Sequence, residues 1–169
     1  MMKLTTTCAV RRSKILIVLM AATFGCVTLV NNFTDYTAYY QYIGEILSMA
    51  STEGNESRRY RAINSSLFHH RFYWAIITFE TIFTICCLIG TYQLYRTIEA
   101  PRKEFQSAKK FAIIGLTTAI FVYYILYVVI INEWFDVEYS TKRNAFDWAR
   151  SNLAYMFPAL IYVSLKNEH

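Results

Sequence analysis

The sequence predicts an all-α integral membrane protein, a four-helix bundle with an extra amphipathic helix in its first outer loop. Three observations lead to this prediction: four long apolar runs, the scarcity of charge within them, and the alternating basic content of the segments between them. The 169 residues are 55% hydrophobic and 17% charged, which suits a chain that faces acyl tails and neighbouring helices. We expect a single membrane domain over residues 1–169, because the runs leave no room for a separate soluble domain.

The four runs predict membrane spans at about residues 15–33, 72–95, 111–132 and 148–165. Each is near the roughly 20 residues that a helix needs to cross the hydrocarbon core. Lys and Arg gather before the first run, from Lys3 to Lys14, and again between the second and third, from Arg96 to Lys110. Because cytoplasmic segments carry this excess, we expect a multi-pass protein with both termini in the cytoplasm. Helix-end placement also explains the net charge of +5, so we expect no nucleic-acid partner.

The first run has an alternative interpretation. It follows a basic stretch and contains small residues at Ala21, Ala22 and Gly25, a combination that is also typical of a removable export signal. Cleavage would leave three spans and place the new N-terminus on the outer side.

The outer segment after the first run has helical periodicity through residues 36–49. Thr34 and Asp35 are suited to cap this helix. Its apolar positions recur at steps of three and four and are Tyr36, Tyr39, Tyr40, Ile43, Ile46 and Leu47. We expect the helix to lie along the headgroup boundary or over the mouth of the bundle, with a simple packing role as the alternative.

Glu80 is an acidic residue inside the second predicted span, about 12 Å from its start at Phe72. An isolated carboxylate at this depth costs several kcal/mol, so it needs a proton or a partner. Antiparallel spans put Arg150 at a similar depth, and we expect Glu80 and Arg150 to form an intramembrane polar pair. The pair either fixes helix register or belongs to a site for an ion, a proton or a ligand.

Polar and aromatic residues also gather at the outer ends of the spans. They predict a shallow outward-facing pocket, with ordinary interfacial anchoring as the alternative. The members of this outer cluster are Asn31, Asn32, Asp35, Tyr39, Tyr40, Glu133, Trp134 and Asn152.

Catalytic and metal-binding motifs are not evident. There is no His-Glu-x-x-His pair, no glycine-rich phosphate loop and no serine in a nucleophile elbow. The adjacent Cys86 and Cys87 point about 100° apart on a helix, which does not suit a metal pair. We expect no enzyme, no catalytic residue, no metal and no cofactor, while a lipid-modifying enzyme using His70 or Glu133 stays an alternative.

Several short sequence motifs in the chain resemble those of a bacterial family of small integral membrane proteins, domain of unknown function 2165. They are Asn31-Asn32-Phe33-Thr34-Asp35-Tyr36, Arg61-Ala62-Ile63, Tyr73-Trp74 with Ile76, Ile77 and Glu80, and Glu133-Trp134-Phe135. Family members usually carry glycine before the last triplet, where this chain has Asn132, and a tryptophan-rich stretch after it, where this chain has residues 136–139. The resemblance implies a four-helix protein of the bacterial inner membrane, and it implies no activity.

Two functions are compatible with these features. The first is an interaction protein, either an accessory subunit or an immunity-type protein against a membrane-acting toxin, whose outer aromatic residues bind another membrane or periplasmic protein. Its other expected partners are the lipid bilayer and, as a homo-oligomer, further copies of itself. The second is a small proton- or cation-linked transporter that uses Glu80.

Overall fold

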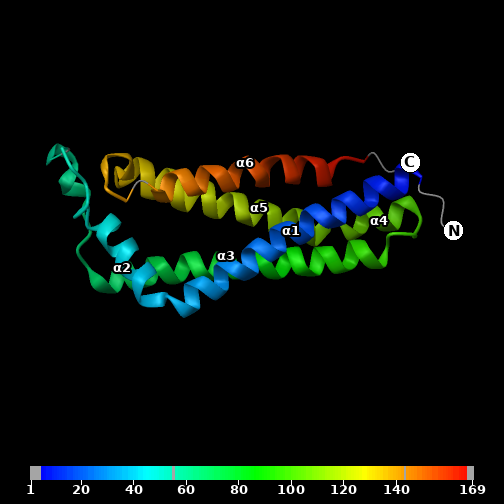
Figure 1. Ribbon diagram of the computed structural model, residues 1–169, viewed down its shortest axis with the longest axis horizontal. Coiled ribbons are helices and arrows are strands. Elements are labelled where there is room, and N and C mark those ends of the chain that lie inside the picture. The colour runs from blue at the N-terminus through cyan, green and yellow to red at the C-terminus, as the bar shows by residue number, and fades with distance from the viewer. Residues whose placement is uncertain (1–4, 55, 143, 167–169) are drawn as a thin grey trace.

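The computed structural model describes residues 5–54, 56–142 and 144–166, and regular structure in these ranges is entirely helical (Figure 1). The all-α prediction is therefore confirmed for this part of the chain. In order, the elements are α1 (Thr6–Thr34), α2 (Tyr36–Leu47), η1 (Glu56–Arg61), α3 (Ser66–Arg96), α4 (Arg102–Ala108), α5 (Lys110–Phe121), η2 (Val122–Trp134), η3 (Val137–Tyr139) and α6 (Asn144–Ser164).

Three stretches of the described chain are long and apolar enough to cross a membrane: Thr6–Thr34, Ser66–Arg96 and Arg102–Trp134. The helix α6 is not among them. Its first turns carry Asp147, Arg150 and Asn152, and the apolar residues 153–163 extend only about 16 Å at helical rise. A hydrocarbon core is about 30 Å thick, so the fourth crossing stays a prediction.

Local sequence explains where the helices begin and end. The Thr5 hydroxyl accepts a hydrogen bond from the Cys8 amide at the start of α1, and Ser65 accepts one from Phe68 at the start of α3. Asp35 joins α1 to α2, but its side chain makes no capping hydrogen bond, which corrects the expected cap. The helix α2 ends at Leu47, two residues before the predicted end, and Met49 beyond it has a left-handed φ of 52°.

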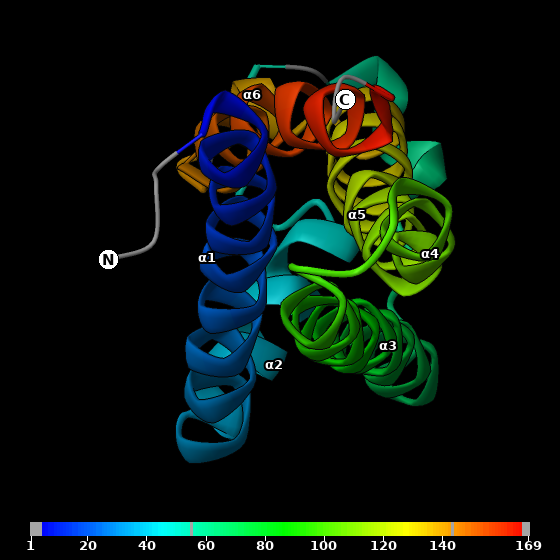
Figure 2. The ribbon, with the colours of Figure 1, turned by 90° about the vertical axis from the view of Figure 1, so that its right-hand side faces the viewer.

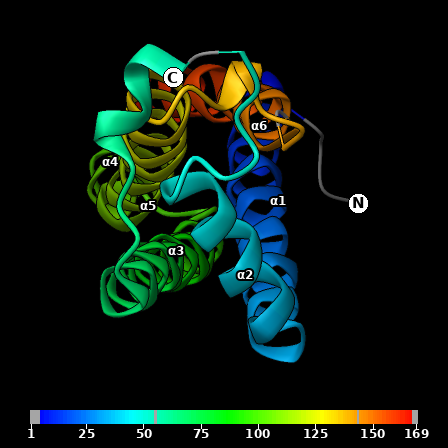
Figure 3. The ribbon, with the colours of Figure 1, turned by 90° about the vertical axis from the view of Figure 1, so that its left-hand side faces the viewer.

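The helix α1 crosses the molecule obliquely. It lies beside α6 at the end that holds the start of the chain and beside α3 at the α2 end (Figures 1 and 2). Hydrogen bonds mark both contacts: Ser13 bonds to Tyr162 of α6 at 2.7 Å, and Asn32 bonds to Glu80 of α3 at 2.5 Å. This course separates α1 from α6 near α2. Figure 3 views the molecule from that end, with α2 in front of α1 and α3.

Small residues allow α3 and α5 to pack closely. A Cβ atom added at Gly90 of α3 would lie 2.5 Å from the backbone nitrogen of Ala112, and one added at Gly115 of α5 would lie 2.6 Å from Cys87 Sγ. Such close approach is a common basis of helix association in lipid. The helices α3 and α5 therefore form a closely packed pair.

Buried basic residues hold together the end that contains the start of α1 and the end of α6. Lys14 and Lys109 both donate to the carbonyl oxygen of Leu165, at 2.6 and 2.7 Å. Arg11 donates to the carbonyl oxygens of residues 98 and 100, in the connection before α4. This connection and the N-terminal basic stretch thus share one end, as the predicted orientation requires.

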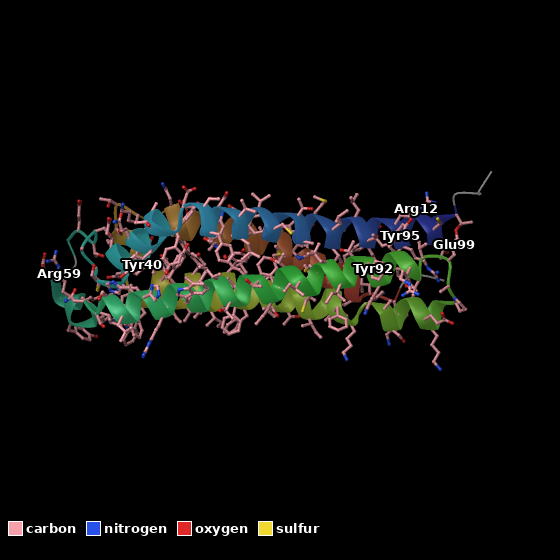
Figure 4. All side chains as sticks on the ribbon, turned by 90° about the horizontal axis from the view of Figure 1, so that it is seen from below. Arg12, Tyr40, Arg59, Tyr92, Tyr95 and Glu99 are labelled. Atoms are coloured by element: carbon pink, nitrogen blue, oxygen red, sulfur yellow. The ribbon has the colours of Figure 1, made fainter. Side chains whose placement is uncertain are left out.

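Aromatic and charged side chains lie at both ends of the long helices. Tyr92 and Tyr95 lie at the end that holds Arg12, whereas Tyr40 and Arg59 lie at the α2 end (Figure 4). Aromatic residues at two levels are typical of the two interfaces of a bilayer.

Candidate functional site: a cavity at Glu80

A cavity of about 390 Å³ lies near the α2 end, where α1 and α6 separate. Residues of α1, α2, α3, η2 and α6 line it. Val27, Asn31, Tyr39 and Asn144 are exposed and form its rim. The oblique course of α1 therefore produces an opening that the straight antiparallel bundle of the sequence analysis does not contain.

Glu80 lines this cavity and is fully buried, with a relative exposure of 0%. Its Oε2 atom accepts a hydrogen bond of 2.5 Å from the side-chain amide of Asn32. Its Oε1 atom has no hydrogen-bond partner within the described residues. Buried polar atoms are nearly always satisfied, so a half-satisfied carboxyl group beside a cavity indicates a site.

Tyr73 orients the amide that holds Glu80. Its hydroxyl donates to the side-chain oxygen of Asn32 at 3.2 Å and lies 3.4 Å from the backbone oxygen of the same residue. With its oxygen accepting from Tyr73, the Asn32 amide presents its nitrogen to Glu80. The hydrogen bonds from Tyr73 to Asn32 and from Asn32 to Glu80 therefore fix the Oε2 side of the carboxyl group and leave Oε1 without a partner among the described residues.

The expected Glu80–Arg150 pair is not found in the described part of the chain. The inner face of α6 is formed by Ala145, Ala149 and Leu153, and Arg150 turns away from it to an exposed position. Successive residues on a helix point about 100° apart, so burial of Ala149 directs Arg150 outward. Asn32 occupies the place that the sequence analysis gave to Arg150, because α1 lies against α3 at this depth.

Aromatic rings form much of the cavity wall. Trp148 of α6 lies at the centre of a group, with its ring centroid 5.4 Å from that of Tyr127 and 6.2 Å from that of Phe24. The full aromatic lining is Phe24, Tyr39, Tyr42, Tyr73, Tyr127 and Trp148. The cavity is thus an apolar, π-rich space with one carboxyl group in its wall.

The η2 segment is a π-helix of 13 residues that continues α5. Its hydrogen-bond pattern is carried to its end, where the Phe135 amide donates to the carbonyl oxygen of Ile130 at 3.2 Å. Tyr127 lines the cavity, and Tyr123 packs behind it against Trp148 with ring centroids 5.3 Å apart. Since π-helical turns are rare and often lie at functional sites, their position here supports the choice of this cavity.

The outer cluster of the sequence analysis divides into two groups. Asn31, Asn32 and Tyr39 meet Glu80 at the cavity. The other members lie elsewhere: Asp35 is exposed at the α1–α2 junction, Tyr40 bonds to the backbone of Ser66, Asn152 bonds to its own helix at Trp148, and Glu133 and Trp134 are exposed near η3.

Several lining residues were not predicted as site residues. Phe24 and Thr28 precede Asn31 and Asn32 by helical steps on α1, and Tyr73 lies two turns before Glu80 on α3. That spacing was available in the sequence. Tyr127 could not be found in this way, because a π-helix changes which residues share a face.

The model of one protein family, described as "Predicted small integral membrane protein (DUF2165)", matches residues 10–166. The chain belongs to this family. The resemblance expected from its short sequence motifs is therefore confirmed, and the family description agrees with the three helices that are long and apolar enough to cross a membrane. Searches of curated proteins and of solved structures found no match.

The DUF2165 site can bind a charge but shows no metal-binding cluster. No group of three or more His, Cys, Asp or Glu side chains suited to a metal ion is present in the described ranges. A single carboxyl group with one unpartnered oxygen can take up a proton or a monovalent cation. Because the carboxyl group is buried, water does not stabilise its charge. The group therefore holds either a proton or a cation, and not both.

Proposed function

We propose that this membrane protein binds a cation in the cavity at Glu80, in exchange for a proton. The observation that carries the proposal is Glu80, a buried residue in the cavity wall whose Oε1 atom has no hydrogen-bond partner among the described residues. A bare carboxylate in this apolar setting is costly, so the group holds a proton when the cavity contains no cation. Arrival of a cation releases that proton.

We also propose that the chain crosses the inner membrane four times, with both termini in the cytoplasm and the cavity near the outer face. The proposal is supported by α6, which runs back beside α1 and α5 so that Leu165 meets Lys14 and Lys109. A helix with a short apolar stretch can be accommodated in a bilayer that thins locally around it. This topology makes a proton-linked transporter the natural role for the exchange at Glu80.

Carbodiimide labelling tests the proposed exchange. Dicyclohexylcarbodiimide is apolar and reacts with protonated carboxyl groups, so it should modify Glu80 within the bilayer. We expect one adduct on the peptide that contains Glu80, detected by mass spectrometry, and a labelling rate that falls as the pH rises. Glu80→Gln should abolish the adduct, whereas the matched control Glu138→Gln, at an exposed position, should not.

Two results would contradict the proposal. One is the absence of any adduct at Glu80 in the folded protein. The other is labelling that stays constant between low and high pH, because a group that never ionises cannot exchange its proton for a cation.

A second candidate function is protein–protein interaction through the aromatic tip beyond α2. Trp134 is 51% exposed, and the Arg61 guanidinium lies 4.8 Å from its ring centroid. Tyr60 and Tyr139 are exposed at the same tip. Such Trp, Tyr and Arg groups are typical of binding hot spots, which favours an accessory subunit or an immunity-type protein. Purification in mild detergent should recover a stoichiometric partner that Trp134→Ala loses, and repeated recovery of the protein alone would argue against this function.

A further inference from the structure

The shape and lining of the Glu80 cavity indicate more than the sign of its ligand. We infer that the cation is an organic ammonium ion with a compact apolar body, bound with its charge at Glu80 and its body against the aromatic wall. This inference rests on the proposed function, because it names the ligand class of the same site.

Size separates an organic ligand from a bare ion. The cavity volume of about 390 Å³ is within the roughly 300–1,000 Å³ of pockets that hold small organic molecules. A desolvated inorganic cation would fill a small part of this space and would leave the rest as an apolar void. A ligand with an apolar body fills it and removes its own surface from water.

The available oxygen atoms also disfavour a hard inorganic cation. Such ions take roughly six or more oxygen ligands. In this cavity the Asn32 side-chain oxygen accepts from Tyr73, and the hydroxyl groups of Tyr42 and Thr28 donate to backbone carbonyl oxygens. Glu80 is the one acidic side chain among the described lining residues. A single carboxylate suits an ammonium group better than a hard divalent ion, whose sites are commonly built from several carboxylate and carbonyl oxygens.

The aromatic wall supplies the second half of an ammonium site. Trp148 and Tyr127 meet at an angle of 65° with centroids 5.4 Å apart, and Phe24 adds a third ring beside Trp148. Ring faces attract alkylated ammonium groups, most strongly where water is excluded. They attract small hydrated ions much less, since those ions keep their water.

The charges around the cavity favour a cation over an anion. Neither Lys nor Arg is present among its described lining residues, and Glu80 is its acidic group. Lys142 is not among the lining residues: its Nζ atom pairs with Glu45 at 3.0 Å and lies 5.5 Å from the ring centroid of Tyr42. A cation that enters past Tyr39 and Asn144 therefore meets aromatic rings at the sides and, at Glu80, a carboxyl group that becomes negative when its proton leaves.

Competition between an organic cation and carbodiimide tests this inference on the full-length protein in detergent micelles. The probe is benzyltrimethylammonium chloride. Its control is neopentylbenzene, which has the same shape with carbon in place of the charged nitrogen, and potassium chloride controls for ionic strength. We expect benzyltrimethylammonium to slow labelling of Glu80 at least tenfold at saturation, and we expect neither control to slow it.

Variants separate binding from folding. Glu80→Gln cannot be labelled, so its binding is measured by equilibrium dialysis of radiolabelled benzyltrimethylammonium, and we expect at least a tenfold loss of affinity. Glu80→Asp keeps the charge and should bind more tightly than Glu80→Gln, which shows that a loss does not arise from misfolding. Trp148→Leu should weaken binding of benzyltrimethylammonium, whereas Glu138→Gln should change neither this binding nor the carbodiimide labelling of Glu80.

The outcomes distinguish this inference from the function on which it rests. Labelling of Glu80 that depends on pH but is not slowed by benzyltrimethylammonium overturns the organic ligand and leaves cation exchange standing. Equal protection by neopentylbenzene or by potassium also overturns it. Failure of Glu80 to react at any pH overturns both.

Discussion

The side-chain amide of Asn32 on α1 donates a 2.5 Å hydrogen bond to the carboxyl group of Glu80 on α3. The two residues are 48 positions apart in the chain, and both are buried. This bond joins the helix that crosses the molecule to the helix that carries the acid. It therefore couples the packing of α1 to the position of the Glu80 carboxyl group.

Replacement of Asn32 should destabilise the protein. Asn32→Ala removes the donor from a buried carboxyl group, and we expect a loss of about 1 to 3 kcal/mol in unfolding free energy. Unfolding by sodium dodecyl sulfate in mixed micelles measures it. Asn152→Ala is the control, because the Asn152 amide bonds only to its own helix at Trp148 and its loss should cost less than about 0.5 kcal/mol. Equal effects of the two substitutions would contradict the assigned role of Asn32.

The α3–α5 contact should be sensitive to a single methyl group. In Gly90→Ala the new Cβ meets the backbone of Ala112, which cannot move aside as a flexible side chain can. We expect destabilisation of about 1 to 3 kcal/mol. In Gly44→Ala the new atom meets the ring of His69 at 3.1 Å, so a smaller effect should appear in the same assay. A harmless Gly90→Ala would mean that the two helices are farther apart.

The connection after η2 should depend on Asp136. This residue has a left-handed φ of 59° and forms a 2.5 Å ion pair with Arg58 at the α2 end of the molecule. Asp136→Ala loses the pair and strains the backbone, with an expected cost of about 1 to 3 kcal/mol. Asp136→Asn tolerates the same φ and should cost less. Limited proteolysis of the outer loops reports the difference, and identical cleavage rates for the two variants would contradict it.

The sequence predicted the helices better than their arrangement. Hydropathy located the cores of α1, α3 and α5, because a span in lipid must be long and apolar regardless of its neighbours. The arrangement of the helices depends on close packing at Gly25, where α1 meets α3, and at Gly90 and Gly115, where α3 meets α5. Such packing is a property of a pair of helices, so the sequence of one helix does not reveal it. The partner of Glu80 was missed for this reason.

Glu80 itself was evident from the sequence, because an acid within an apolar run stands out. The cavity around Glu80 was less evident from the sequence, because side chains from five elements line it and a π-helix sets the direction of Tyr127. The aromatic lining was interpreted as anchoring at the interface because Tyr and Trp serve that purpose as well. The separation of α1 from α6 at the cavity is the feature that distinguishes aromatic rings that line a site from rings that anchor a helix at the interface.

The proposed topology predicts a pattern of labelling from the two sides of the membrane. In a variant without the native cysteines, Glu53→Cys and Glu138→Cys should react with an impermeant maleimide added outside intact cells, because both positions are exposed at the α2 end. Lys103→Cys and Lys166→Cys should react only after permeabilisation. Labelling of residue 166 from outside would show that α6 does not cross.

The release of protons on ligand binding is the decisive measurement for the proposed exchange of a cation for a proton at Glu80. Benzyltrimethylammonium is added to the purified protein in weakly buffered micelles, at a pH where Glu80 still reacts with carbodiimide, and the protons released are counted with a pH indicator. We expect release that approaches one proton per protein for the natural sequence and for Glu138→Gln, and no release for Glu80→Gln. Saturable binding with no release from the natural sequence would contradict it, because the cation and the proton would then not share Glu80.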